Sequence, residues 1–106
     1  LYAAGHYAAM AQIPAVHLSG WYDPYALTAA ENYRGIAALN PKAARLILGP
    51  WTHGQRSVTY AGDVDFGPAA TLDGNLAADY VALRLAWFDH HLRGAPLPQI
   101  LQSPVK

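Results

Sequence analysis

The sequence contains no cysteine, so disulfide bonds and cysteine nucleophiles are excluded. It also has few charges, because Asp, Glu, Lys and Arg make up 13% of the residues, against about 25% in an average soluble domain. Seven basic and seven acidic residues cancel, and no run of Lys or Arg provides the basic patch that nucleic acids or anionic membranes require. We therefore expect neither as a partner. The compartment stays open, with the cytoplasm slightly favoured.

Long apolar runs and metal-binding patterns are missing as well. No stretch approaches the roughly 20 apolar residues that cross a membrane. The most suggestive histidines, His90 and His91, are adjacent in a predicted helix, where neighbouring side chains point about 100° apart and do not readily share an ion. We expect no metal and no other cofactor.

The sequence is instead rich in apolar residues, at 53% of 106 positions. This length allows at most one small domain or a piece of a larger one. The sequence opens at Leu1 without a methionine, and Ser103 to Lys106 reads as the start of an extended segment, so a piece is the interpretation we favour. We then expect much of the apolar surface to be covered by a partner, either the remainder of the same domain or a second copy of the chain.

Periodicity predicts a strand, a helix and a second strand in the first half of the sequence. Residues 13–20 and 43–48 are short apolar runs bounded by proline or glycine, as in buried strands. Residues 24–40 read as a helix, with Asp23 as a possible N-cap and proline at the first helical position.

A second helix is predicted over residues 75–92, after a loop of residues 51–74, and Gly94 is a suitable residue to end it. Two adjacent rows of large apolar residues indicate a broad face that packs on a sheet. The first row is Leu76, Tyr80, Leu83 and Trp87, and the second is Val81, Leu85, Phe88 and Leu92. The proline-rich residues 95–106 read as a hinge. The fold class is α/β, with parallel strands in the order strand-helix-strand-helix.

Parallel pairing brings the carboxyl ends of the two strands to one edge of the sheet, where open α/β sheets keep their chemistry. Asp23 follows the first strand and His53 follows the second. A carboxylate that holds an imidazole is the arrangement in which histidine can take a proton from a nucleophile. Asp before His is also the order found in α/β-hydrolases, whose serine comes earlier in the chain. No G-x-S-x-G segment occurs here, so we expect that serine upstream of Leu1.

Four blocks of the sequence together resemble one known family. They read AQIPAVHLSGWYDPY, ARLILGPWTHG, DFGPAA and LRLAWFDHHLRG. The sequence is similar to the cocaine esterase and X-Pro dipeptidyl-peptidase (S15-like) family of serine hydrolases. The resemblance implies that residues 1–94 are the C-terminal portion of an α/β-hydrolase catalytic domain. It also implies that residues 95–106 are a hinge and the start of a following jelly-roll domain.

Carried over to this sequence, the resemblance makes Asp23 in GWYD the acid of the catalytic triad and His53 in GPWTHG its base. The serine lies in a segment that is not present, so we expect these residues alone to be inactive. Without the resemblance, the ordinary interpretations are favoured, with Asp23 as a helix cap and His53 as a loop histidine. Trp21, Tyr22 and Trp51 either line a substrate pocket or pack against the sheet edge.

The resemblance implies a small-molecule ester or peptide as substrate, and we rank an acyl esterase or amidase before an X-Pro dipeptidyl-peptidase. The alternative is a catalytically incomplete structural or interaction fragment that oligomerises through exposed sheet edges.

Overall fold

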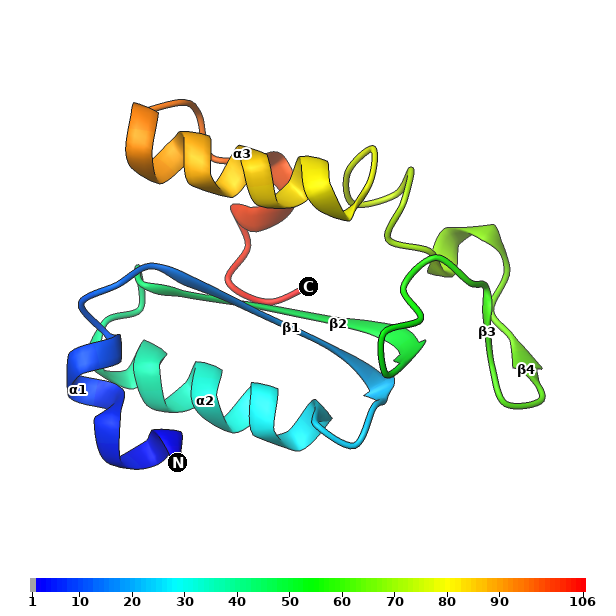
Figure 1. The fold of residues 1–106 in the computed structure, drawn as a ribbon, viewed down its shortest axis with the longest axis horizontal. Helices are drawn as coiled ribbons and strands as arrows, with labels where there is room; N and C mark the ends of the chain where they lie inside the picture. The colour runs from blue at the N-terminus through cyan, green and yellow to red at the C-terminus, as the bar shows by residue number, and fades with distance from the viewer. Residues whose placement is uncertain (1) are drawn as a thin grey trace.

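Two parallel strands and the helices on either side of them form the centre of the fold. The computed structural model describes residues 2–106, which leaves Leu1 outside. Strand β1 (Ala15–Tyr22) leads through helix α2 (Ala26–Leu39) into strand β2 (Ala44–Thr52), and the two strands pair in parallel. Helix α2 lies on one face of this sheet and helix α3 (Tyr80–Arg93) on the other (Figure 1). The predicted α/β class and the order of strand, helix, strand and helix are confirmed.

Shorter elements complete the chain. The N-terminal segment forms one turn of 3₁₀-helix and a short helix α1, and the loop between β2 and α3 folds into a small antiparallel hairpin. This hairpin lies beyond the carboxyl ends of β1 and β2 (Figure 1). The bounds are η1 (Ala3–His6), α1 (Tyr7–Met10), β3 (Tyr60–Ala61), β4 (Val64–Asp65), η2 (Pro68–Ala70) and η3 (Gln99–Leu101).

Strand β2 continues four residues past Leu48, where the apolar run had predicted its end. The register runs regularly until Gly20 pairs with Gly49, and pairing resumes when Tyr22 meets Thr52. One residue of β1 therefore faces two residues of β2, which is a β-bulge. Pro50 lies inside this bulge, one of the few places where a strand accepts a proline. The bulge allows β2 to continue to Thr52, so that His53 begins the next loop.

Two glycines make this irregular pairing possible. A Cβ on Gly20 would lie 2.0 Å from the carbonyl oxygen of Trp51, and a Cβ on Gly49 would lie 2.3 Å from the Trp51 indole. Both distances are far below van der Waals contact, so any side chain at either position would displace Trp51. Glycine inside a strand commonly marks a close approach of this kind.

The buried residues form one cluster on each face of the sheet. Between the sheet and α3 lie Ile47, Trp51, Leu72, Leu83, Trp87 and Leu101. On the α2 side lie Ala11, Ile36, Ala43 and Ala44. The alternation of side chains along a strand explains why a strand buried on both faces reads as a nearly continuous apolar run.

The helix boundaries differ from the sequence prediction at their N-termini. Helix α3 begins at Tyr80 instead of residue 75, because Asp79 is its N-cap and accepts a hydrogen bond from the Ala82 N–H at 2.8 Å. Its end at Gly94, with φ 72°, confirms the predicted C-terminal glycine. Helix α2 begins at Ala26, and its N-cap residue Tyr25 makes no side-chain cap. The interpretation of Asp23 as the N-cap was therefore wrong.

Only one of the two predicted apolar rows of α3 is buried. Leu83 and Trp87 of the first row belong to the core, but the whole second row, Val81, Leu85, Phe88 and Leu92, is exposed. The expectation that the broad face packs on the sheet is confirmed for the first row and wrong for the second. Four large apolar side chains on one helix face remain uncovered by residues 2–106.

The C-terminal residues lie beside β2. Leu46 forms an isolated parallel bridge with Val105, through hydrogen bonds to Pro104 and Lys106. A hinge and the start of another domain over residues 95–106 stay a prediction. Among residues 2–106, no helix is both long and apolar enough to cross a membrane.

Candidate active site

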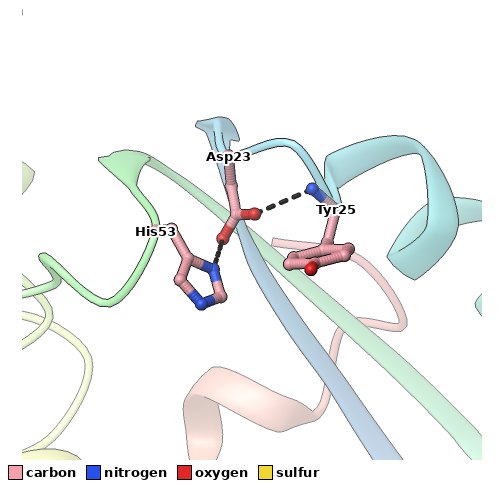
Figure 2. A network of polar contacts seen from close by, with 3 residues as sticks. All are labelled: Asp23, Tyr25 and His53. Atoms are coloured by element: carbon pink, nitrogen blue, oxygen red, sulfur yellow. Dashed lines mark hydrogen bonds and ion pairs between the residues drawn. The ribbon is translucent and has the colours of Figure 1, made fainter.

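Asp23 and His53 meet at the carboxyl edge of the sheet, as the parallel pairing predicts. Asp23 directly follows β1 and His53 directly follows β2. The His53 Nδ1 lies 2.9 Å from the Asp23 Oδ2, a hydrogen-bonding distance. Figure 2 shows the carboxylate between the imidazole and the backbone of Tyr25. Residues 30 positions apart in sequence are thus joined by the pairing of their strands.

Each carboxylate oxygen of Asp23 has its own partner. Oδ1 accepts a hydrogen bond from the Tyr25 N–H at 2.8 Å, while Oδ2 faces His53. The Tyr25 N–H is the main cause that lowers the Asp23 pKa, and His53 lowers it further. Only 8% of the side chain is exposed. Asp23 is therefore ionised at neutral pH and fixed in orientation.

His53 is held on one side and open on the other. Its side chain is 67% exposed, and the Tyr25 ring lies against it edge-on, with centroids 5.3 Å apart. When Nδ1 carries the proton that Asp23 accepts, Nε2 keeps a lone pair. In Figure 2 this second nitrogen points away from the carboxylate. In this arrangement Asp23 orients the ring through Nδ1, and Nε2 is free to accept a proton.

A small hollow of about 140 Å³ lies beside the pair. The ends of β1 and β2 and the loop after His53 form its walls, and they include Leu18, Ser19, Trp51 and Arg56. Ser19 is buried beside the pair, and its hydroxyl also contributes to the lowered pKa of Asp23. None of the described serines follows the G-x-S-x-G pattern, and Ser57 donates its hydroxyl to Asp73.

The three aromatic residues predicted to bind substrate occupy different environments. Trp21 and Tyr22 are 65% and 54% exposed at the end of β1, and Tyr22 contacts Phe66 of the loop after β4, with ring centroids 5.7 Å apart. Trp51 is 2% exposed in the core, and its indole N–H donates to the Ala70 carbonyl at 2.6 Å. Its position favours packing, although it also borders the hollow. A role of these residues in substrate binding stays a prediction.

Sequence reasoning missed Tyr25, which contacts both residues of the pair, and Arg56, which borders the hollow. The Asp-Pro-Tyr sequence carried a signal for Tyr25, because an Asp side chain often accepts a hydrogen bond from the backbone two residues later. That signal was interpreted as a helix cap instead. For Arg56, three residues after His53, no pattern in the sequence marked a role.

The other histidines do not contribute to this site. His17 lies in β1, where its Nε2 is buried without a partner among the described residues and burial lowers its pKa. His90 Nδ1 contacts the Ala95 carbonyl oxygen at 2.7 Å, near the end of α3. Within residues 2–106, no group of three or more His, Asp or Glu side chains is placed to hold a metal ion.

Comparison with known proteins identifies relatives over most of the chain. The sequence model of a family described as X-Pro dipeptidyl-peptidase (S15 family) matches residues 2–55, which include both Asp23 and His53. A cocaine esterase from Rhodococcus sp. (strain MB1 Bresler) is 38% identical over 82 residues. The match covers 76% of this chain but 13% of that esterase. The chain therefore spans a small part of the length of the curated relative it matches.

Proposed function

This chain belongs to the X-Pro dipeptidyl-peptidase (S15) family, and on that premise we propose that it forms the C-terminal part of the catalytic core of a serine hydrolase. The proposed enzyme cleaves esters or amides through an acyl-enzyme, and this chain supplies the acid and the base of the triad. The observation that carries the proposal is the 2.9 Å contact between His53 Nδ1 and the ionised Asp23.

In the proposed mechanism, His53 Nε2 accepts the proton of the nucleophilic serine as the hydroxyl attacks the substrate carbonyl. Asp23 keeps the Nδ1 proton in place and stabilises the imidazolium that forms. The imidazolium then gives its proton to the leaving group, and the same cycle activates the water that releases the acyl group. The serine and the groups that bind the oxyanion come from outside residues 1–106.

The proposed substrate is a small ester, amide or peptide. We rank acyl esterase or amidase activity first, because the relative that is 38% identical over 82 residues is named a cocaine esterase. X-Pro dipeptidyl-peptidase activity ranks second, on the name of the matching family.

The test is steady-state hydrolysis by the full-length protein that carries this sequence. His53→Ala should lower kcat by several orders of magnitude, and Asp23→Asn by somewhat less, because removal of either group disables proton transfer. His6→Ala is the matched control, since His6 is exposed in the N-terminal 3₁₀-helix. Turnover near the wild-type value in both site variants would refute the assignment.

A second proposal describes residues 1–106 in isolation. Within residues 2–106 one edge of β1 has no partner strand, and this edge and the exposed row on α3 favour a catalytically incomplete interaction fragment that associates through these surfaces. We expect the isolated chain to show no esterase activity and to oligomerise in size-exclusion chromatography with light scattering. A soluble monomer that unfolds in one sharp transition would argue against it.

A further inference from the structure

Arg56 is the cation nearest in sequence to His53, and it is held in a defined orientation. Its guanidinium carbon lies 4.2 Å from the centroid of the Tyr80 ring, at the start of α3. Stacking on an aromatic ring fixes the plane of a guanidinium while its edge stays available for hydrogen bonds. The Arg56 Nε is buried and has no hydrogen-bond partner within residues 2–106. A buried donor of a charged group that lacks a partner raises the free energy of the folded state. An acceptor bound at this position would remove that cost.

The charges of the described residues leave Arg56 unpaired. The ion pairs within residues 2–106 join His53 to Asp23 and Arg93 to Asp89. Asp23 borders the same hollow as Arg56, but its two oxygens are already directed to Tyr25 and His53. No ion pair joins Arg56 to a carboxylate within residues 2–106, so its positive charge at the hollow has no negatively charged partner there.

We propose that Arg56 is a specificity-determining residue that binds a carboxylate group of the substrate in the hollow beside His53. The inference rests on the proposed hydrolase function and adds a substrate class to it, namely esters or amides that carry a free carboxylate close to the scissile carbonyl. A guanidinium matches a carboxylate in shape, with two parallel N–H donors for two oxygens. The hollow of about 140 Å³ is on the order of the volume of four or five water molecules, enough for a carboxylate and a short methylene stem.

The competing explanation is that Arg56 serves only to brace the start of α3 through Tyr80. The chain provides a matched control for that explanation. Arg84 also lies over the Tyr80 ring, at 5.4 Å, but it is exposed on α3 and borders a different hollow. Removal of either arginine weakens packing on Tyr80, but only removal of Arg56 should change how the enzyme treats a charged substrate.

The experiment measures kcat/KM of the full-length protein on pairs of p-nitrophenyl esters. One member of each pair is the monoester of succinate, glutarate or adipate, and the other has a methyl ester in place of the free carboxylate. Spontaneous hydrolysis is measured without enzyme and subtracted. We expect the wild type to favour one of the charged esters by about ten- to a hundredfold, the range for a charge-assisted hydrogen-bonded pair.

Arg56→Met should abolish that preference, Arg56→Lys should retain part of it, and Arg84→Met should leave it intact. The ratio of charged to neutral substrate cancels any general loss of folded enzyme. A wild-type ratio at or below one for all three acids overturns the inference, as does a ratio that Arg56→Met leaves unchanged. If either of these results occurs while neutral esters are still hydrolysed in a His53-dependent reaction, the inference alone fails and the proposed function stands. If no ester is hydrolysed, the first-ranked esterase activity fails and the inference falls with it.

Discussion

Substitution of Gly20 by alanine should disrupt the sheet edge that brings the two site residues together. The new Cβ would lie 2.0 Å from the Trp51 carbonyl oxygen and 2.6 Å from its carbonyl carbon. Ordinary van der Waals contact begins at 3.4 Å, so the 2.0 Å approach requires the two backbones to separate by about 1.4 Å at this point. Because both partners are main chain, no side-chain rotation relieves the clash.

The cost of this separation can be expressed in stability and in geometry. Overpacking in a core typically costs about 1–3 kcal/mol, and a backbone clash belongs at the upper end or beyond. Asp23 follows three residues after Gly20, and its contact with His53 measures 2.9 Å. An opening of even half the required distance takes that contact past the limit of a hydrogen bond. The variant should therefore lose both stability and the orientation of His53.

The assay compares Gly20→Ala with Gly5→Ala in the full-length protein, through the midpoint of urea unfolding and through kcat/KM on a neutral ester. A Cβ on Gly5 meets no atom within 4 Å, so this control should change stability by less than about 1 kcal/mol. If Gly20→Ala unfolds at the same urea concentration as the control and retains its activity, the close approach of Gly20 to Trp51 is not present in solution.

Three further predictions concern single contacts. Trp51→Phe removes the indole N–H that donates to the Ala70 carbonyl and should cost about 1–3 kcal/mol in urea unfolding, because a buried acceptor is left without its donor; a loss below about 0.5 kcal/mol would contradict this. Asp79→Ala removes the cap on the Ala82 N–H and should cost about 0.5–2 kcal/mol, with Asp79→Asn as a control that retains most of the stability. Asp23 has a lowered pKa in the folded chain, so its carboxylate stabilises the fold above the unfolded value of about 4, and this contribution is lost as the pH falls through the folded value. The difference in urea midpoint between wild type and Asp23→Asn should therefore be smaller at pH 3 than at pH 7, and an equal or larger difference at pH 3 would refute the assignment of Asp23 as a stabilising anion.

The central strands and the meeting of Asp23 with His53 could be predicted because they follow from simple rules. An apolar run between proline and glycine indicates a buried strand, and one helix between two strands implies parallel pairing. Parallel pairing alone brings the residues after both strands to the same edge. The positions of the strands and the proximity of Asp23 and His53 were predicted correctly because this reasoning needs no knowledge of side-chain packing.

The details that failed depend on contacts distant in sequence. The extension of β2 through Pro50 requires the bulge opposite Gly20, which is visible only once the two strands are paired. The start of α3 was placed too early because Leu76 fits the apolar row, whereas its N–H bonds the Leu72 carbonyl in the preceding turn. An apolar residue at helical spacing does not reveal whether its backbone has already been used elsewhere.

The exposed second row of α3 has the same origin. Periodicity identifies a face that is suited to burial, but not whether residues 2–106 contain the surface that buries it. Val81, Leu85 and Phe88 carry a correct signal for a contact that these residues do not make among themselves. The high apolar content of the sequence and the uncovered face of α3 thus both indicate apolar surface that residues 2–106 do not bury.

The most direct test of the central claim is the intact mass of the full-length protein after treatment with a phosphonate probe that labels activated serines. The claim is that Asp23 and His53 activate a serine elsewhere in the same protein. It predicts that the wild type gains the mass of one probe and that His53→Ala gains it far more slowly, while His6→Ala labels as the wild type does. A wild type that does not label, or a His53→Ala variant that labels at the wild-type rate, would contradict the claim.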